Sequence, residues 1–398
     1  MPETREELYT QKLFPTVNND DLLEFRMPPN AKGHLDLSNV RLHFIATLNT
    51  PDDDHKICFQ NFFGAKQFSS LEVRLNGEAV NRRSCANEYF LSSYFQHMIN
   101  FTSDYQMSGL KPHGIFDVTQ IETSTFNSQD EDTTDKLLRK FRRQVKQTNE
   151  MEILMTLDST LFYSDDLLPS NTSLDLSFER ANGTYSGILY KNAATCTEKA
   201  LDLKDCYLLL PFKKDDELFR LERNAIQKPL KIKFDDYQIK RFNIPKGTSS
   251  VMMSDLIAGP LPGKLFWALQ QIEAYTGSYK ISSTRFEHEH LKRINLFIDG
   301  KEKDGFPMIV SDEHIAQPYV QFLKACNMDQ NGFLSQVLTM DSYAAGNFIL
   351  SAPIAEDTGS ISFEFDFNKP LEKDLVLITC SLSAKTLKLD HNRNFKIY

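Results

Sequence analysis

Leu71-Glu-Val-Arg-Leu-Asn-Gly77 alternates apolar and other side chains with a period of two residues. The apolar residues of such a stretch share one face, which is typical of a β-strand that is buried on one side. The Asn76-Gly77 pair at its end supplies two residues that tolerate a positive φ, as a type I′ hairpin turn requires. We therefore expect a half-buried strand that ends in a tight turn.

A second stretch, Ile294-Asn-Leu-Phe-Ile-Asp-Gly300, repeats this pattern and ends in Asp-Gly. The offset between the two copies is 223 residues at both ends of the motif (71 to 294 and 77 to 300). In both halves a short helix rich in aromatic residues is expected after the turn, over residues 88–99 with Asn87 as its cap and near residues 317–326. A repeat of this length indicates a duplicated domain rather than a solenoid unit.

Length and composition fit a globular protein of two domains. A chain of 398 residues exceeds the size at which one hydrophobic core stops growing, so two domains of about 200 residues are expected. The 30 Phe and 14 Tyr, against the single Trp267, suit large β-sheet cores. The net charge of −9 argues against a coat for nucleic acid, because phosphate binding needs a basic surface. We expect no sequence-specific nucleic-acid partner.

No stretch predicts insertion into a membrane or export. The most apolar run, residues 256–269, is interrupted by Gly, Pro and Lys and falls short of the roughly 20 residues that cross a bilayer. Residues 1–7 lack the basic and apolar regions of a signal peptide. The cysteines form no Cys-x-x-Cys pair, so we expect reduced thiols in the cytoplasm or nucleus. They are Cys58, Cys85, Cys196, Cys206, Cys326 and Cys380.

Many other short stretches alternate in the same way, among them residues 40–48, 174–179 and 361–367. Short strands, few helices and long loops in each half indicate an all-β protein. We expect two tandem eight-stranded antiparallel jelly-roll β-sandwiches, a double jelly roll, with short helices in the loops. Periodicity alone does not distinguish a jelly roll from an immunoglobulin-like sandwich.

The expected units are an N-terminal arm over residues 1–20, a first jelly roll over residues 21–222 and a second over residues 223–398. Residues 132–146 carry apolar side chains at helical spacing and basic side chains on the opposite face. A solvated surface helix within a long loop is the simpler interpretation. A patch that faces nucleic acid or a membrane is the alternative.

Two patterns resemble sites for chemistry. Gly259-Pro-Leu-Pro-Gly-Lys264 is one residue shorter than a phosphate-binding loop and lacks the following Ser or Thr that binds magnesium. His288 and His290 are weak candidates for metal ligands, because residues two apart on a strand face the same way. The next Glu, Glu302, lies beyond the hairpin, so a third ligand is missing at the usual spacing. Two solvent-facing histidines are the simpler interpretation.

The sequence also lacks the Gly-x-Ser-x-Gly motif of an α/β-hydrolase nucleophile. We therefore expect a protein that is not an enzyme, with no catalytic residue, no bound metal and no cofactor. The residues to which the sequence assigns a definite role are structural turn residues. These are Asn76, Gly77, Asp299 and Gly300.

Several motifs, taken in order, resemble one family. They are Phe63–Gly77, Glu88–Tyr94, Phe242–Gly247, Gly259–Gly263, Ala274–Gly277 and Leu387–Phe395. Together they resemble segments of the double jelly-roll major capsid proteins of Polinton (Maverick) elements and the related adintoviruses. The likeness covers roughly residues 20–398. It departs after Gly277, where the family tends to have a stretch rich in Asn, Pro and Phe, and in the charged segment 128–150.

The resemblance implies a structural protein of an icosahedral, virus-like shell. Three chains would form a trimeric, pseudo-hexameric capsomer (a hexon), which assembles with further copies and with a minor, penton capsid protein. The protein would then lie in the virion capsid after assembly in the host cytoplasm or nucleus. Two alternatives remain: a carbohydrate- or metal-binding jelly-roll protein of the cupin or lectin kind, centred on His288 and His290, and a host protein derived from a capsid gene and reused for interaction.

Overall fold

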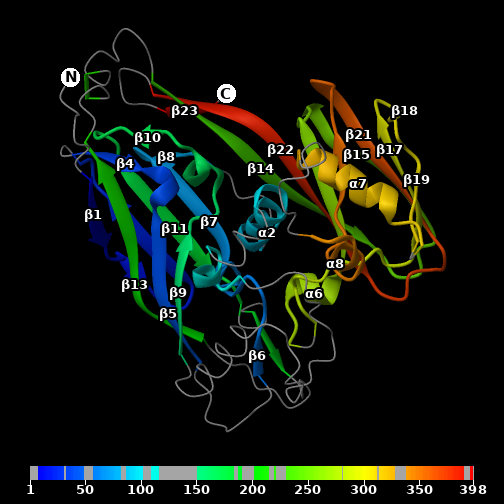
Figure 1. Cartoon of the computed structure of the whole chain (residues 1–398), viewed down its shortest axis with the longest axis horizontal. Coiled ribbons are helices and arrows are strands. Elements are labelled where there is room, and N and C mark those ends of the chain that lie inside the picture. Colours follow the sequence, from blue (N-terminus) through cyan, green and yellow to red (C-terminus); the bar gives the residue numbers. More distant parts are fainter. Residues whose placement is uncertain are drawn as a thin grey trace.

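The computed structural model describes residues 8–30, 33–48, 57–81, 87–101, 109–115, 150–182, 187–190, 201–214, 219–220, 230–279, 281–311, 313–327, 338–389 and 395–397. These residues form two β-sandwich barrels that lie next to each other along the long axis of the molecule (Figure 1). Within these ranges, no helix combines the length and the apolar character needed to cross a bilayer.

The first barrel consists of two facing antiparallel sheets. One sheet contains β1 (Leu8–Leu13), β13 (Leu201–Lys213), β5 (Arg41–Leu48) and β9 (Glu150–Thr156), with the short β4 (His34–Asp36) and β10 (Leu167–Leu168) at one end. The other contains β2 (Val17–Asn18), β3 (Leu22–Met27), β11 (Leu174–Arg180), β7 (Phe68–Leu75) and β8 (Glu78–Ala79). A separate pair, β6 (Ile57–Phe59) and β12 (Ile188–Tyr190), lies at the lower end of this barrel in Figure 1.

The second barrel repeats this arrangement. Its first sheet contains β14 (Leu230–Ile244), β22 (Leu375–Leu389), β16 (Lys264–Gln271) and β20 (Leu350–Pro353), and β23 (Phe395–Ile397) pairs with the end of β22. Its second sheet contains β15 (Ser250–Pro260), β21 (Thr358–Phe367), β17 (Leu291–Ile298), β18 (Lys301–Glu302) and β19 (Met308–Ile309).

Strand order confirms the double jelly roll. The path β1-β13-β5-β9 in the first barrel corresponds to β14-β22-β16-β20 in the second, and β3-β11-β7-β8 corresponds to β15-β21-β17-β18. Residues Phe68–Leu75 of β7 and Leu291–Ile298 of β17 have bounds that differ by the 223-residue offset of the sequence motif (68 to 291 and 75 to 298). In both barrels the chain passes back and forth between the two sheets, and the strand paths of the two barrels match. This arrangement favours the jelly roll over an immunoglobulin-like sandwich.

Strands β7 and β17, which contain the two repeated motifs, also occupy equivalent positions within the sheets. Leu71 of β7 lies opposite Phe178 of β11, and Ile294 of β17 lies opposite Phe365 of β21. All the apolar residues of both motifs that were expected to share a face are buried, because alternation turns them towards the opposite sheet. They are Leu71, Val73 and Leu75 in the first barrel and Ile294, Leu296 and Ile298 in the second.

The turns after these strands have left-handed backbone conformations at both positions. The φ angles are 50° at Asn76 and 84° at Gly77, and 49° at Asp299 and 73° at Gly300. Each Asx side chain also accepts a hydrogen bond from the strand next to it in the sheet. Asn76 Oδ1 accepts one from the Ser173 amide and Asp299 Oδ1 one from the Ser360 amide, both at 2.8 Å.

We expect Gly77→Val and Gly300→Val each to destabilise the protein by about 1–3 kcal/mol, because a β-branched residue resists a positive φ. A Cβ atom at either position would meet no atom within 4 Å, so the cost comes from backbone strain and not from a clash. Calorimetric melting measures the effect, and Gly77→Asn is the matched control, since Asn tolerates this conformation. A Gly77→Val protein that melts together with the wild type would contradict this role for the turn.

Helices occupy the connections. They are α1 (Phe63–Lys66), α2 (Glu88–Asn100), α6 (Ile272–Thr276), α7 (Ala316–Ala325) and α8 (Met340–Ala344), with 3-10 turns η1 (Leu37–Asn39), η2 (Lys111–His113) and η3 (Thr160–Tyr163). α2 and α7 are the two helices expected after the turns. Asn87 precedes α2 in a left-handed conformation and makes no side-chain cap, and its Nδ2 atom donates to the Tyr275 carbonyl oxygen.

Two further expectations concern residues 8–13 and residues 132–146. Residues 8–13, which the sequence places in an arm, form β1 and pair with β13 along their whole length. Thr10, Gln11 and Lys12 are exposed there, so the segment lacks the alternation that marks a half-buried strand. The basic helix expected over residues 132–146 lies outside the described residues.

Candidate functional site: the seam between the barrels

A long two-stranded ribbon connects the barrels. β14 and β22 are 15 residues each and pair without a break from Leu230↔Leu389 to Ile244↔Leu375. Figure 1 shows this ribbon running across the top of the molecule from the second barrel towards the first. Because a strand rises about 3.4 Å per residue, the ribbon is about 50 Å long, enough to reach both barrels.

The ribbon contributes side chains to both hydrophobic cores. We call the buried cluster around Phe44, Val73 and Phe178 the first core, and the cluster around Trp267 and Phe363 the second core. The end of the ribbon and β23 belong to the first core, although all these residues come from the second half of the chain. They are Ile232, Phe234, Leu387, Leu389 and Phe395.

Helix α2 makes the reciprocal exchange. It belongs to the first half of the chain, yet its large apolar side chains pack in the second core. They are Phe90, Leu91, Tyr94, Phe95, Met98 and Ile99. Tyr94 illustrates the contact, since its ring centre lies 4.7 Å from that of Phe286 and its hydroxyl donates to Asn347 Oδ1 at 3.0 Å. Each barrel is therefore completed by residues of the other half.

A buried polar network joins the halves beside α2. The side-chain oxygen of Gln60 accepts hydrogen bonds from Lys66 Nζ at 2.6 Å and from the amide and hydroxyl of Ser283, both at 3.1 Å. Lys66 is fully buried, and its ammonium also lies 4.9 Å from the centre of the Phe90 ring. Polar groups buried in this way stabilise a structure only when they are hydrogen-bonded, so the network fixes how the halves meet.

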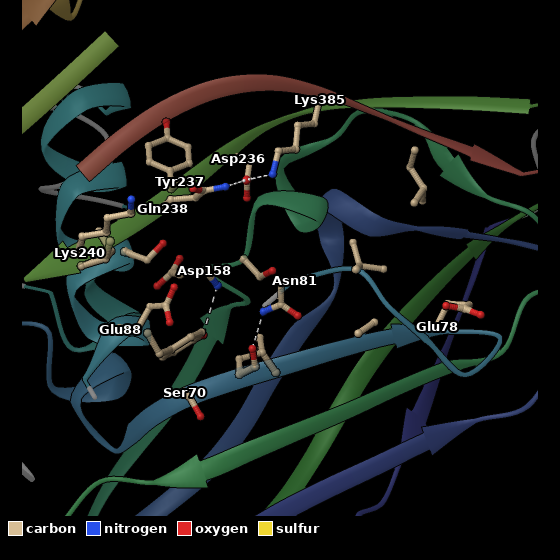
Figure 2. Close-up of a pocket in the computed structure, with 18 of the residues that line it drawn as sticks. Ser70, Glu78, Asn81, Glu88, Asp158, Asp236, Tyr237, Gln238, Lys240 and Lys385 are labelled. Carbon is tan, nitrogen blue, oxygen red and sulfur yellow. Dashed lines mark hydrogen bonds and ion pairs between the residues drawn. The ribbon is translucent and has the colours of Figure 1, made fainter. Parts of the chain in front are cut away.

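A cleft of about 630 Å³ opens along this seam. Figure 2 shows its walls: the β7–β8 turn and α2 on one side, and the β14–β22 ribbon on the other. Asp236 of β14 is engaged by the Lys385 ammonium and by Gln238 Nε2, and Asn81 accepts from the Val73 amide at 2.7 Å. The lining is thus polar, and these charged and amide groups bind partners within their own wall: Asp236, Gln238 and Lys385 within the ribbon, and Asn81 with β7.

Asp158 lines this cleft and is 3% exposed. Its carboxylate accepts hydrogen bonds from Ser93 Oγ of α2 at 2.5 Å and from the Tyr163 hydroxyl of η3 at 2.6 Å. The Asp158 amide donates to the Tyr89 hydroxyl at 3.1 Å. Burial and the nearby Asp158 charge raise the pKa of Tyr163, so this phenol remains a donor. Asp158 therefore attaches α2 to the first barrel.

The candidate metal ligands do not line this cleft and directly precede β17 of the second barrel. His288 and His290 are not on a strand, because β17 begins at Leu291 and both Glu289 and His290 have positive φ angles of 49° and 60°. The two imidazole ring centres are 6.4 Å apart and nearly perpendicular. Among the described residues, no group of three or more His, Cys, Asp or Glu side chains could hold a metal ion.

The remaining sequence patterns have structural surroundings. Residues 259–264 span the end of β15, the turn at residues 261–263 and the start of β16, and Lys264 Nζ donates to the Ala325 carbonyl oxygen at 2.6 Å. Cys206, Cys326 and Cys380 are buried free thiols. Burial raises the pKa of Cys206 to about 11 and that of Cys326 to about 12, which keeps both protonated at neutral pH.

Comparisons with known proteins agree with this architecture. No protein-family model matches the chain, and no curated protein matches it. A chain in the solved structure of the Sputnik virophage matches with a TM-score of 0.65 and 12% identity, over 98% of this chain and 88% of that one. The mavirus major capsid protein matches with a TM-score of 0.55 and 10% identity, over 98% and 90% of the two chains.

A chain of the PBCV-1 virus capsid matches with a TM-score of 0.55 and 11% identity, over 100% of this chain and 97% of that one. These structural neighbours are double jelly-roll major capsid proteins of giant viruses and virophages. At such low identities the likeness concerns the fold, and it spans both barrels and the connections between them.

Proposed function

We propose that this chain is a major capsid protein, three copies of which form a trimeric, pseudo-hexameric capsomer of an icosahedral shell. The observation that carries the proposal is the double jelly roll, which matches viral capsid chains along almost the whole length of both partners. Two barrels with corresponding sheets make a subunit of two similar lobes. Three such subunits around a threefold axis present six lobes, a near-hexagonal block that tiles a flat facet.

The contact between subunits would be heterologous, since the first barrel of one copy meets the second barrel of the next, and it would close after three copies. The exchange of ribbon and helix supports this role, because it makes a two-lobed subunit rigid. A rigid subunit gives a capsomer of defined shape. In our proposal residues 21–222 and 223–398 make up most of the two jelly rolls, and residues 8–13 and 17–18 of the N-terminal arm (residues 1–20) add β1 and β2 to the first.

The finer assignment is to the capsid proteins of Polinton (Maverick) elements and adintoviruses, on the motifs of the sequence. The partners would then be further copies of the chain and a minor, penton capsid protein. Nucleic acid would be enclosed without sequence-specific contacts, and the protein would reside in the virion capsid.

Electron microscopy of the purified protein tests this function. We expect near-hexagonal blocks and, under assembly conditions, closed shells. A protein that forms no such blocks and copurifies with stoichiometric zinc or iron would instead favour the metal-binding alternative. A protein that forms neither blocks nor shells and contains no metal would favour a host protein reused for interaction.

A further inference from the structure

Two buried histidines pack against each other where α2 meets the first barrel. His97 of α2 and His113 of η2 are 2% and 6% exposed, and their ring centres are 6.4 Å apart. Phe62 and Phe101 cover the His97 ring, with centres 5.5 Å and 4.9 Å away. The site is thus apolar around the imidazoles and closed to water.

A hydrogen bond locates one ring proton of His97. Its Nδ1 atom lies 2.6 Å from the Ser93 carbonyl oxygen, which can only accept, so the ring proton is on Nδ1. Within the described residues, His97 Nε2 and His113 Nδ1 are buried and have no hydrogen-bond partner. A proton on Nδ1 of His113 would therefore create a buried donor without an acceptor, which is costly.

The charged groups around the pair give little compensation. His113 is influenced by Asp158 after β9, by His97 of α2 and by Arg41 of β5, and Lys111 precedes it on η2. Asp158 is the one acid among these, and its oxygens already accept from Ser93 and Tyr163. Tyr163 and Tyr89 are kept protonated by burial, which raises the pKa of both phenols. Two imidazolium ions here would repel each other.

We propose that His97, His113 and Asp158 form an acid-sensitive latch, which holds α2 on the first barrel at neutral pH and weakens that attachment when the surroundings become acidic. Because α2 also fills the second core, releasing it from the first barrel loosens the whole seam. In a shell this would soften the capsomer in an acidic compartment, a consequence that rests on the proposed capsid function.

The direction of the effect follows from linkage. Burial lowers the pKa of His113 to about 4, from an ordinary value of 6.5. The unfolded chain therefore binds a proton below pH 6.5 that the folded chain does not bind until about pH 4. Stability is fully present above pH 6.5 and is lost as the pH falls towards 4. Between pH 8 and pH 5 the folding equilibrium constant should fall about 30-fold from His113 alone.

Denaturant unfolding of the free chain at pH 8 and pH 5, with hydrogen exchange of residues 88–100, tests the latch without any need for assembly. Between pH 8 and pH 5, the folding equilibrium constant of the wild type should fall about 30-fold more than that of His113→Phe. His314→Gln is the matched control, because His314 is exposed, and it should follow the wild type. The amides of α2 should lose protection at pH 5 in the wild type and keep it in His113→Phe.

A wild-type pH dependence in His113→Phe, or equal protection of α2 at both pH values in the wild type, would overturn the proposal. If His113→Phe does not fold at neutral pH, His113→Gln is measured in the same way, because it also cannot take up a proton. Failure of the latch leaves the capsid function untouched, since neither measurement depends on a trimer or a shell.

Discussion

Residues 1–222 expressed without the second half should not fold into a stable barrel. The first core would lose Ile232, Phe234, Leu387, Leu389 and Phe395, all of which are buried in it and come from the ribbon and β23. Burial of such side chains stabilises a protein by about 1.5–3 kcal/mol each, on the order of 10 kcal/mol in total. That equals the whole stability of a typical domain. At the same time the apolar side of α2 would be exposed to water.

Near-ultraviolet circular dichroism and limited proteolysis of the fragment measure this outcome. The matched control is co-expression of residues 1–222 with residues 223–398. This pair can make every contact of the full chain and lacks only the peptide bond between residues 222 and 223. We expect the two fragments to purify as one folded complex. A fragment 1–222 that melts cooperatively at the temperature of the full chain would show that the exchange of side chains between barrels contributes little.

Phe234→Ala should destabilise the complete protein by about 3–5 kcal/mol, the usual cost of removing a buried aromatic ring. Phe234 comes from β14 but packs in the first core, whereas Trp267 lies fully buried in the second core. Trp267 is the single tryptophan of the chain, so its fluorescence reports the second barrel alone. Because the ribbon and α2 join the cores, we expect the Trp267 transition to shift with the overall transition.

Lys233→Ala is the control for this experiment, because Lys233 is the neighbouring residue of β14 and its side chain points outwards to solvent. It should leave both transitions within about 0.5 kcal/mol of the wild type. A Phe234→Ala protein in which circular dichroism reports early unfolding while Trp267 keeps its wild-type transition would mean that the barrels unfold independently.

The sequence predicts the duplicated strands and turns well because these depend on local patterns. Alternation places Leu71 and Ile294 on inward faces, and only residues that tolerate a positive φ suit positions such as Asn76 and Asp299. The sequence does not predict in which of the two cores a buried residue packs. Phe234 alternates like any strand residue, and nothing near it in the sequence shows that it packs in the first barrel.

The seam also depends on contacts between distant segments. Ser93 meets Asp158 across 65 positions, and Tyr94 meets Asn347 across 253 positions. Single-sequence patterns contain no signal for such pairs. The strand expected at His288 and His290 is wrong for a different reason: two consecutive non-glycine residues, Glu289 and His290, adopt positive φ angles, which sequence patterns rarely indicate.

The mass of the purified protein in solution is the most direct test of the capsomer. Contacts of an obligate trimer typically bury more than about 2,000 Å², so the complex should persist at micromolar concentration. Light scattering coupled to size exclusion should therefore give about three times the 45.8 kDa of the chain. A clean monomer or a twofold dimer in several buffers would contradict the proposal that this double jelly roll builds capsomers.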